Sequence, residues 1–350
     1  MNLKKFTALL LAALLCLSLC GCSGSSKSVG VVTAPDGTEY TVSRGLYRMV
    51  QLTALAVAAT DVDPDGEMTT EELLAASYQG TTVRAWVEDR VQQGLVRYMV
   101  VEQLFNEHNG AFTDVEMYYY KSVIDDTWNM YDKLYVSNDV DRDGFSSYQY
   151  NMLREFQLPL LLCAEDGPLQ PAAADVNAFA ETSVAAATYI AIGTSKADGT
   201  SLSPTETIAA AEIAGKLCED AAAMGMDAAW EANKLDVLKL LGMDVTTEES
   251  PVRDGLFAVG AGLFSDALVE EVLAIPVGET RLCTEADGSL FAVMRTALSA
   301  EDDEALREQY ILAEGDALIA DYLAEAVKGW SFTLSEKAAE RYSPDSITFE

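Results

Sequence analysis

The chain has 350 residues, of which 56 are acidic and 23 are basic, giving a formal net charge of −33. Because affinity for the phosphate backbone depends on Lys and Arg, this balance argues against nucleic acid as a partner. His108 is the single histidine. A single histidine excludes metal sites built from several histidines, and any Ser-His-Asp relay would have to use His108. Its surroundings, Asn106–Gly110, are typical of a helix C-terminus, where a cation is favourable, so we interpret His108 as part of a helix end.

The N-terminus has the pattern of an export signal. Two lysines precede the apolar run Thr7–Leu19, whose length of about 13 residues is below the roughly 20 that a membrane-spanning helix needs. The sequence Leu-Cys-Gly-Cys at 19–22 resembles the bacterial lipobox. It predicts a lipoprotein signal peptide over 1–21 and lipid attachment at Cys22, on the outer face of a cell membrane. A flexible tether follows over 22–28, and an ordinary cleaved signal or an anchor helix stays open as the alternative.

Residues 29–183 are predicted to form a mostly helical lobe. It begins with a hairpin that turns at Asp36-Gly37, and Ser43 then caps the first helix. Thr113, with Glu116 three residues later, forms a capping-box pattern. The expected helices span 43–59, 82–105, 113–133 and 146–158, the last ended by Pro159, and a short helix ends near 181.

The pattern changes over 184–298, where short apolar runs with turn signals indicate a small β-α-α-β-β domain. Its expected strands span 187–193, 281–284 and 290–295, its helices span 204–225, 228–241 and 266–274, and residues 242–263 are expected to be irregular. Residues 299–350 are then expected to form a long helix and a tail that return to the helical lobe. The sequence therefore predicts an α+β fold, with the small domain inserted into a mostly helical lobe.

This order of elements resembles the extracytoplasmic foldases of the PrsA/SurA type, in which a chaperone lobe carries a parvulin-type peptidyl-prolyl isomerase domain. The strongest local similarity is Phe264–Glu279, which resembles the "F-x-x-A … L-x-x-G-E" segment of that domain. Weaker similarities cover Phe112–Glu116, Leu169–Ile192 and Gly288–Met294. The resemblance implies a membrane-anchored chaperone whose partners are unfolded or extended secreted polypeptides. Nothing in the sequence fixes an oligomeric state.

The residues that would catalyse isomerisation are degenerate. Parvulins carry one histidine in the first strand and another in the last, whereas this chain has Tyr189 near the first position and Leu290 or Phe291 at the second. Asp254 is the nearest residue to the acidic or cysteine position of the middle segment. No catalytic residue is carried over, and we expect isomerase activity to be weak or absent. An active peptidyl-prolyl isomerase stays an alternative, since the reaction needs no covalent step.

One loop matches the calcium pattern D-x-D-x-D-G-x5-E. Its candidate ligands are Asp61, Asp63, Asp65, Glu67, Thr69 and Glu72. The competing interpretation is an ordinary turn followed by a capping box at Thr69 and Glu72. Calcium is thus the one cofactor that the residues suggest, and the chaperone role itself requires none. A calcium-stabilised surface adaptor lipoprotein without a folding role is the corresponding alternative function.

Aromatic residues gather around the third predicted helix. Tyr118, Tyr119, Tyr120, Trp128, Tyr131 and Tyr135 lie on or near it, and Tyr148, Tyr150 and Phe156 follow. They could line a groove for unfolded peptide or pack between helices. Their spacing of three and four residues favours core packing for most of them.

Overall fold

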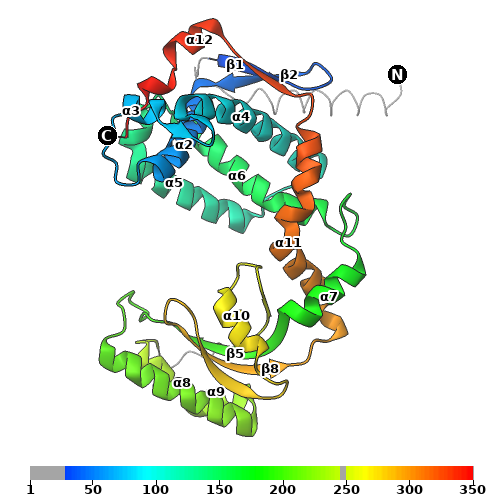
Figure 1. The fold of residues 1–350 in the computed structure, drawn as a ribbon. Helices are drawn as coiled ribbons and strands as arrows, with labels where there is room; N and C mark the ends of the chain where they lie inside the picture. The colour runs from blue at the N-terminus through cyan, green and yellow to red at the C-terminus, as the bar shows by residue number, and fades with distance from the viewer. Residues whose placement is uncertain (1–27, 245–249, 350) are drawn as a thin grey trace, which may run out of the picture. The chain divides into compact units, whose positions relative to one another are not determined.

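The structure is a computed structural model that describes residues 28–244 and 250–349. The fold is α+β and mostly helical, and the chain divides into two compact units (Figure 1). Unit 1 contains residues 1–156 and 324–350, and unit 2 contains residues 157–323. The predicted signal peptide and Cys22 lie outside the described residues. No helix in the described part is long and apolar enough to cross a membrane.

A three-stranded antiparallel sheet in unit 1 joins the two ends of the chain. Strands β1 (Ser28–Thr33) and β2 (Glu39–Ser43) form the predicted hairpin, and β9 (Ser331–Leu334) pairs with the other edge of β1. At Gly30, a Cβ atom would lie 2.5 Å from the backbone oxygen of Thr333, so the approach of β9 requires glycine. The residues expected to form a tail belong to unit 1, and they include β9 and α12 (Glu336–Arg341).

The helices of unit 1 begin at caps that the sequence indicates. Ser43 and Thr82 accept backbone N–H groups at the starts of α2 and α4, and Thr113 forms the predicted capping box of α5 with Glu116. His108 is the C-cap of α4. The elements are α2 (Arg44–Val62), α3 (Thr70–Ala75), β3 (Ser77–Tyr78), β4 (Thr81–Thr82), α4 (Val83–Glu107), α5 (Asp114–Ser137) and α6 (Arg142–Leu162).

Helix α6 differs from the prediction at both ends. It begins before Ser146 because the Asp141 carboxylate accepts the backbone N–H of Gly144 at 2.8 Å and so caps the first turn. It continues through Pro159 to Leu162, although this proline lacks the N–H that would donate to the carbonyl of Glu155. In unit 2, Gly315 faces this proline, and a Cβ atom there would lie 2.5 Å from the ring of Pro159.

A buried arginine holds the C-terminal residues on unit 1. Arg48 is 2% exposed, and its guanidinium donates to the backbone oxygens of Asn138, at 2.8 Å, and Ser346, at 3.3 Å. The guanidinium donates a third hydrogen bond, at 2.6 Å, to the side-chain oxygen of Gln51. Asn138 also donates to the backbone oxygen of Thr348 and accepts its N–H. Burial lowers the pKa of Arg48, and these neutral acceptors replace the water that the guanidinium loses.

Unit 2 is built on a four-stranded antiparallel sheet with the order β6-β5-β8-β7. Its strands are β5 (Val184–Ile192), β6 (Arg253–Ala258), β7 (Thr280–Thr284) and β8 (Leu290–Thr296). Strand β6 lies in the region expected to be irregular, so the prediction of three strands was incomplete. It is an edge strand that begins with two exposed charged residues and a glycine, which is a weak strand pattern.

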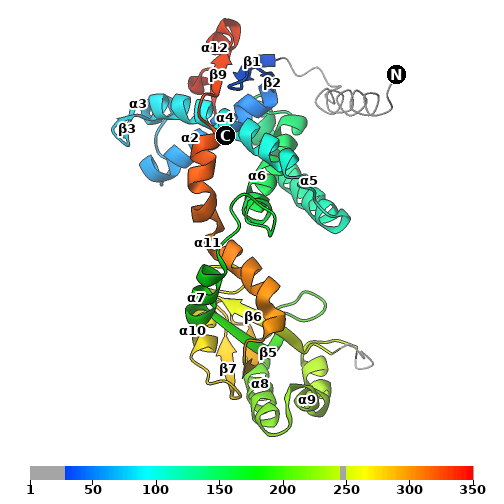
Figure 2. The same ribbon diagram turned by 90° about the vertical axis from the view of Figure 1, so that its right-hand side faces the viewer.

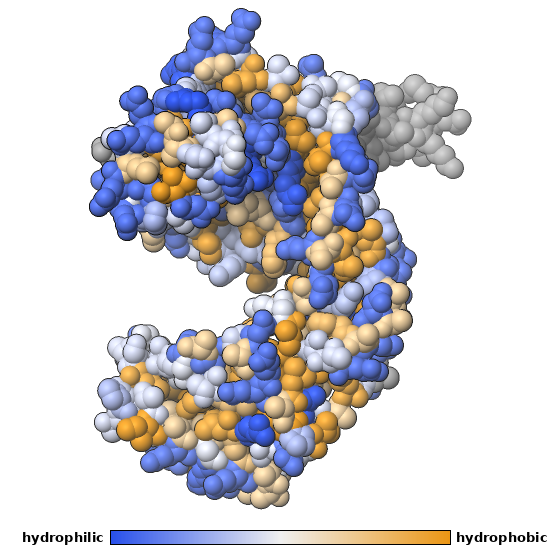
Figure 3. Space-filling model, viewed as in Figure 1, coloured by the Kyte–Doolittle hydropathy of each residue, from blue (hydrophilic) through white to orange (hydrophobic). Residues whose placement is uncertain are grey.

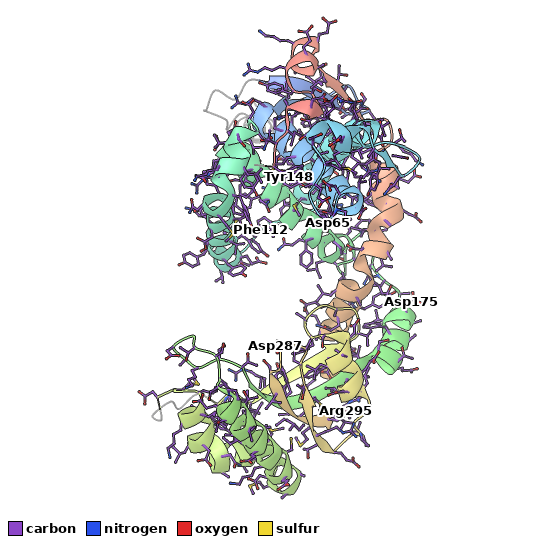
Figure 4. All side chains as sticks on the ribbon, turned by 60° about the vertical axis from the view of Figure 1, so that its left-hand side comes forward. Asp65, Phe112, Tyr148, Asp175, Asp287 and Arg295 are labelled. Atoms are coloured by element: carbon purple, nitrogen blue, oxygen red, sulfur yellow. The ribbon has the colours of Figure 1, made fainter. Side chains whose placement is uncertain are left out.

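Helices cover both faces of this sheet (Figure 2). Ile190 and Ile192 of β5 pack against α8 (Pro204–Met224) and α9 (Met226–Leu240), while Phe257 and Phe291 pack with α10 (Asp266–Leu273) on the other face. Arg295 of β8, labelled in Figure 4, donates to the backbone oxygen of Leu273 at 2.9 Å and so binds the end of α10.

Two further helices extend unit 2 beyond the expected boundaries at 184 and 298. Val176 of α7 (Ala173–Ser183) and Leu306 of α11 (Asp303–Ala326) share a core cluster with Val184 and Ala258 of the sheet. A short 3-10 turn, Ala300–Asp302, precedes α11, and a second one spans Pro344–Ser346 in unit 1. Because both flanking helices bury apolar residues on the sheet, the compact unit runs from 157 to 323.

Candidate functional site

A cavity of about 680 Å³ opens in unit 2 beside the edge of the sheet. Its walls come from β5, β6, the loop before α10, the end of β8 and the start of α11. Tyr189 and Asp254, two of the three positions singled out from the sequence, line it. The third, Phe291, lies behind Tyr189 and is 7% exposed.

Aromatic rings form the apolar side of the cavity. The ring centroid of Tyr189 lies 5.3 Å from that of Phe257 and 5.8 Å from that of Phe291. Phe264, from the loop before α10, stacks on Phe257 at 4.3 Å and lines the cavity. Strand pairing explains this assembly, because β5 lies between β6 and β8 and presents Tyr189 on the same face as the two phenylalanines. Gly255 leaves room for the tyrosine ring, since a Cβ atom there would lie 3.2 Å from it.

Polar groups form the other side of the cavity. Asp254 pairs with Thr188 across the strands, and the threonine hydroxyl donates to its carboxylate at 2.6 Å. Asp302, the last residue of the 3-10 turn before α11, accepts the backbone N–H and the hydroxyl of Ser299. Gln309 lies two turns further along α11, is 7% exposed, and its side-chain oxygen has no hydrogen-bond donor.

The described lining of this cavity consists of acidic, neutral polar and apolar residues. None of the described residues that line it is a histidine, cysteine, lysine or arginine. His108 belongs to α4 in unit 1. The remaining groups are carboxylates, hydroxyls, an amide and aromatic rings, which orient and surround a ligand.

Sequence reasoning missed the contribution of α11 to this site. In the sequence, Asp302 can be recognised only as the residue that completes the capping box begun by Ser299. Gln309 carries no signal at all, because a glutamine on a helix is ordinary until its burial is known. Both residues lie more than a hundred positions from Tyr189 along the chain, and the tertiary fold brings them to one cavity.

In unit 1, the residues of the calcium-like loop have protein partners. Asp61 lies in the last turn of α2 and accepts the hydroxyl of Tyr78 at 2.6 Å. Asp63 is the C-cap of that helix and accepts two backbone N–H groups, of Glu67 at 2.9 Å and Met68 at 3.0 Å. Asp65 and Glu67 are exposed, and Figure 4 shows Asp65 between α2 and α3.

The end of the loop forms the capping box that was the competing interpretation. Thr69 and Glu72 exchange backbone and side-chain hydrogen bonds, and these bonds hold the pKa of Glu72 below its usual value. Within the ranges 28–244 and 250–349, no three His, Cys, Asp or Glu residues are arranged to hold a metal ion. Calcium binding stays a prediction.

The three cysteines that the structure describes are buried free thiols. Burial raises the pKa of Cys218 to about 11 and that of Cys283 to about 12. Because the thiolate is the reactive form, these side chains are inert at neutral pH and serve as small apolar residues.

Helix α5 in unit 1 exposes several apolar side chains on one side, which we call the outer face of α5. Its members, separated by four, four and seven residues, lie on one side of the helix, opposite buried Ile124. They are Val115 (79% exposed), Tyr119 (64%), Val123 (45%) and Met130 (71%). Tyr118 beside them is 81% exposed.

The remaining aromatic residues divide between core and surface. Tyr135 and Phe145 are buried, with ring centroids 4.7 Å apart, and Trp128 stacks on Tyr135. By contrast, Tyr131 is 47% exposed and Phe156 is 69% exposed. Core packing was therefore the wrong expectation for a large part of this group. Figure 3 shows apolar patches at the surface of both units.

Comparison with known proteins yields structural likeness without sequence kinship. No protein-family model matches the chain, and no curated protein matches it. Among solved structures, the foldase protein PrsA from Streptococcus pneumoniae is 12% identical, with a TM-score of 0.37 over 72% of this chain and 92% of that one. PrsA from Bacillus subtilis is 14% identical, with a TM-score of 0.31 over 74% of this chain and 93% of that one. With likeness this low, a proposal about function has to rest on the chain's own residues.

Proposed function

We propose that this chain is a chaperone that holds unfolded or extended segments of secreted polypeptides, attached by lipid at Cys22 to the outer face of a membrane. The observation that carries the proposal is the outer face of α5. An isolated exposed apolar residue is normal on a protein surface, but a row of them along a helix marks a binding surface. Tyrosine and methionine side chains suit varied partners, because both present large and adaptable contact surfaces.

The composition supports the same role. The outer face of α5 belongs to a strongly acidic chain, whose net charge keeps it soluble while apolar side chains are exposed. Unfolded polypeptides present short apolar segments that are buried in the folded state. Covering such a segment removes apolar surface of both partners from water, at roughly 25 cal/mol per Å².

We further propose that the chain has little or no isomerase activity. The barrier to rotation about a prolyl bond is about 20 kcal/mol, and a catalyst must stabilise the twisted amide. Where the resembled family has histidines, this chain has Tyr189, which lines the cavity of unit 2, and Phe291, which is buried behind it. The exchange rate of a proline peptide measured by NMR should therefore equal the uncatalysed rate. The active-isomerase alternative requires a faster rate that changes when Tyr189 or Phe291 is substituted.

An aggregation assay tests the chaperone role. The purified protein should delay light scattering by a chemically unfolded client after dilution. The double variant Tyr119→Gln and Met130→Gln should lose most of this effect, because glutamine keeps helix propensity and removes the apolar contact. The matched control, Ile208→Gln with Met224→Gln, changes two exposed apolar residues of α8 in unit 2 and should retain it. Equal protection by both variants would overturn the assignment to α5.

A further inference from the structure

We propose that strand β9 binds an extended segment of an unfolded polypeptide, which adds a fourth strand to the larger sheet of unit 1. This inference rests on the proposed function, and it gives unit 1 a contact with the client's backbone in addition to the outer face of α5. Because the sheet has the order β2-β1-β9, one edge of β9 pairs with β1 and the other pairs with no described strand. We call this second edge the free edge of β9.

The register shows which backbone groups point toward the free edge of β9. The N–H of Ser335 donates to the backbone oxygen of Val29 at 2.9 Å, so these two residues form a hydrogen-bonded pair. Hydrogen-bonded and non-hydrogen-bonded positions alternate along an antiparallel pair. Leu334 and Phe332, one and three positions before Ser335, therefore direct their N–H and C=O groups away from β1. Within 28–244 and 250–349, no residue forms a hydrogen bond with these groups.

The free edge of β9 lacks the features that protect the other edges of the two larger sheets. Edge strands commonly carry charged residues or proline, which hinder pairing with another strand. Strands β2, β6 and β7 are also edges, and they contain Glu39, Asp254 and Arg281, respectively. Strand β9 has the sequence Ser-Phe-Thr-Leu, with neither a charge nor a proline. Unpaired backbone groups on an uncharged edge are the surface to which an extended polypeptide adds.

Two cavities border β9 and provide room for side chains of the added strand. Their volumes are about 700 and 270 Å³, and both are lined by Phe332 and by Gln92 of α4. Trp330 belongs to the larger cavity, whereas Leu334 and Ala339 line the smaller one. Because successive side chains of a strand point to opposite faces, every second side chain of the added strand faces these cavities. The segment therefore carries a large apolar side chain and, two residues away, a smaller one.

The charges of the larger cavity favour an acidic residue in the segment. Arg90, Arg97 and Asp89 line this cavity. Arg97 is paired with Glu155, and Asp89 accepts a hydrogen bond from Gln93 at 2.7 Å. Arg90 forms no ion pair with a residue that the structure describes. An acidic residue beside the apolar ones complements Arg90, whereas the net charge of −33 on the whole chain repels acidic peptides.

Disulfide crosslinking to the full chain tests the strand pairing. Thr333 on β9 and Thr41 on β2 both pair with Val31, and both are exposed. Thr333→Cys and its matched control Thr41→Cys therefore place a thiol on the same face at the two edges of one sheet. Extended apolar peptides would each carry one cysteine, activated as a mixed disulfide, at successive positions. Thr333→Cys should crosslink severalfold more at every second position, while Thr41→Cys should stay near the wild type, whose described cysteines are buried.

Backbone methylation of the peptide measures the main-chain hydrogen bonds. Two peptides of one sequence would be N-methylated at either the odd or the even positions, and fluorescence anisotropy would compare them. One should bind roughly tenfold more weakly than the other, because it alone loses the donors that face β9. The measurement uses the double variant Tyr119→Gln and Met130→Gln, so that binding to the outer face of α5 does not mask the difference.

A charge exchange in the peptide tests the role of Arg90. A peptide with glutamate beside its apolar residues should bind more tightly than the same peptide with lysine, and Arg90→Gln should remove this preference. The control Arg281→Gln, which removes an exposed charge from the edge strand β7, should retain it. A preference for lysine would contradict the placement of the segment beside Arg90, since the general acidity of the chain would then decide binding.

The outcomes separate this inference from the proposed function. Crosslinking without alternation, or equal crosslinking from Thr41→Cys, would overturn the inference and leave the outer face of α5 as the client site. Equal binding of the two methylated peptides would also overturn it, since the backbone would then make no contribution. Alternating crosslinks confined to Thr333→Cys, together with failure to delay aggregation of a client, would support the inference and overturn the chaperone role.

Discussion

Helices α4 and α5 have nearly the same length and lie in the same unit, yet they treat their apolar residues in opposite ways. Nine residues of α4 are buried, spaced mostly by three and four along one face. In α5, only Ile124 and Tyr135 are buried, and the outer face of α5 is apolar and exposed. The difference shows that α4 is part of the core of unit 1, whereas α5 packs through only a few side chains and leaves its outer face exposed to a partner.

The largest expected effect comes from truncating a buried side chain of α4. Leu95 is fully buried, so Leu95→Ala should lower the free energy of unfolding by about 2–5 kcal/mol. Met130→Ala on the outer face of α5 should change it by less than about 0.5 kcal/mol. Urea denaturation measures both. Similar losses in the two variants would show that the outer face of α5 is packed in solution, and the comparison would fail.

The C-terminal end of α5 offers the next largest effect. Asn138, its C-cap, exchanges two hydrogen bonds with Thr348 and donates to Leu134. Asn138→Ala should destabilise unit 1 by about 1–3 kcal/mol, because buried backbone groups lose their partners. Hydrogen exchange should show faster exchange at the amide of Thr348. Unchanged protection there would mean that the end of α5 is held by something else.

A smaller effect is expected at the start of α4. Arg84 forms an ion pair with Asp345, and it holds the pKa of that carboxyl well below its usual value. A lowered carboxyl pKa contributes stability that is complete above the unfolded pKa of about 4 and is lost as pH falls through the lowered value. Because both side chains are more than a third exposed, the contribution should be below about 1 kcal/mol. The difference in stability between wild type and Asp345→Asn should therefore shrink below pH 4, and a difference that grows on acidification would contradict this sign.

The smallest effect concerns calcium. The calcium hypothesis predicts that millimolar calcium raises the melting temperature of the wild type and leaves that of Asp61→Ala unchanged. The existing hydrogen bonds of Asp61, Asp63 and Glu72 favour the other outcome, a melting temperature that calcium does not alter. A wild-type shift that Asp61→Ala abolishes and Asp139→Ala retains would establish the site and revive the adaptor alternative.

Local signals predicted the helices of this fold well. Caps such as Ser203 with Glu206, which begin α8, and Thr113 with Glu116 act within one turn, so the sequence contains all the information that they need. Strand β9 could not be found in this way. It has four residues, and its partner β1 lies some three hundred positions earlier in the chain. Such a strand is defined by pairing rather than by its own pattern.

The candidate site was predictable only in part. Alternation along β5 and β8 places Tyr189 and Phe291 on one face of the sheet, and the resemblance pointed to both. The role of Gln309 depends on how α11 packs against the sheet. The exposure of Tyr119 reversed the expectation of core packing, because helical spacing shows that residues share a face without showing what covers that face.

The most direct test of the account is site-specific photo-crosslinking to an unfolded client. A photoreactive phenylalanine analogue would replace Tyr119 on the outer face of α5 or Ile208 on α8, which are exposed to almost the same extent, 64% and 63%. The account predicts abundant crosslinks from position 119 with an unfolded client, few from 208, and loss of both when the client is folded. Equal crosslinking from the two positions, or crosslinks from 119 that persist with the folded client, would contradict it.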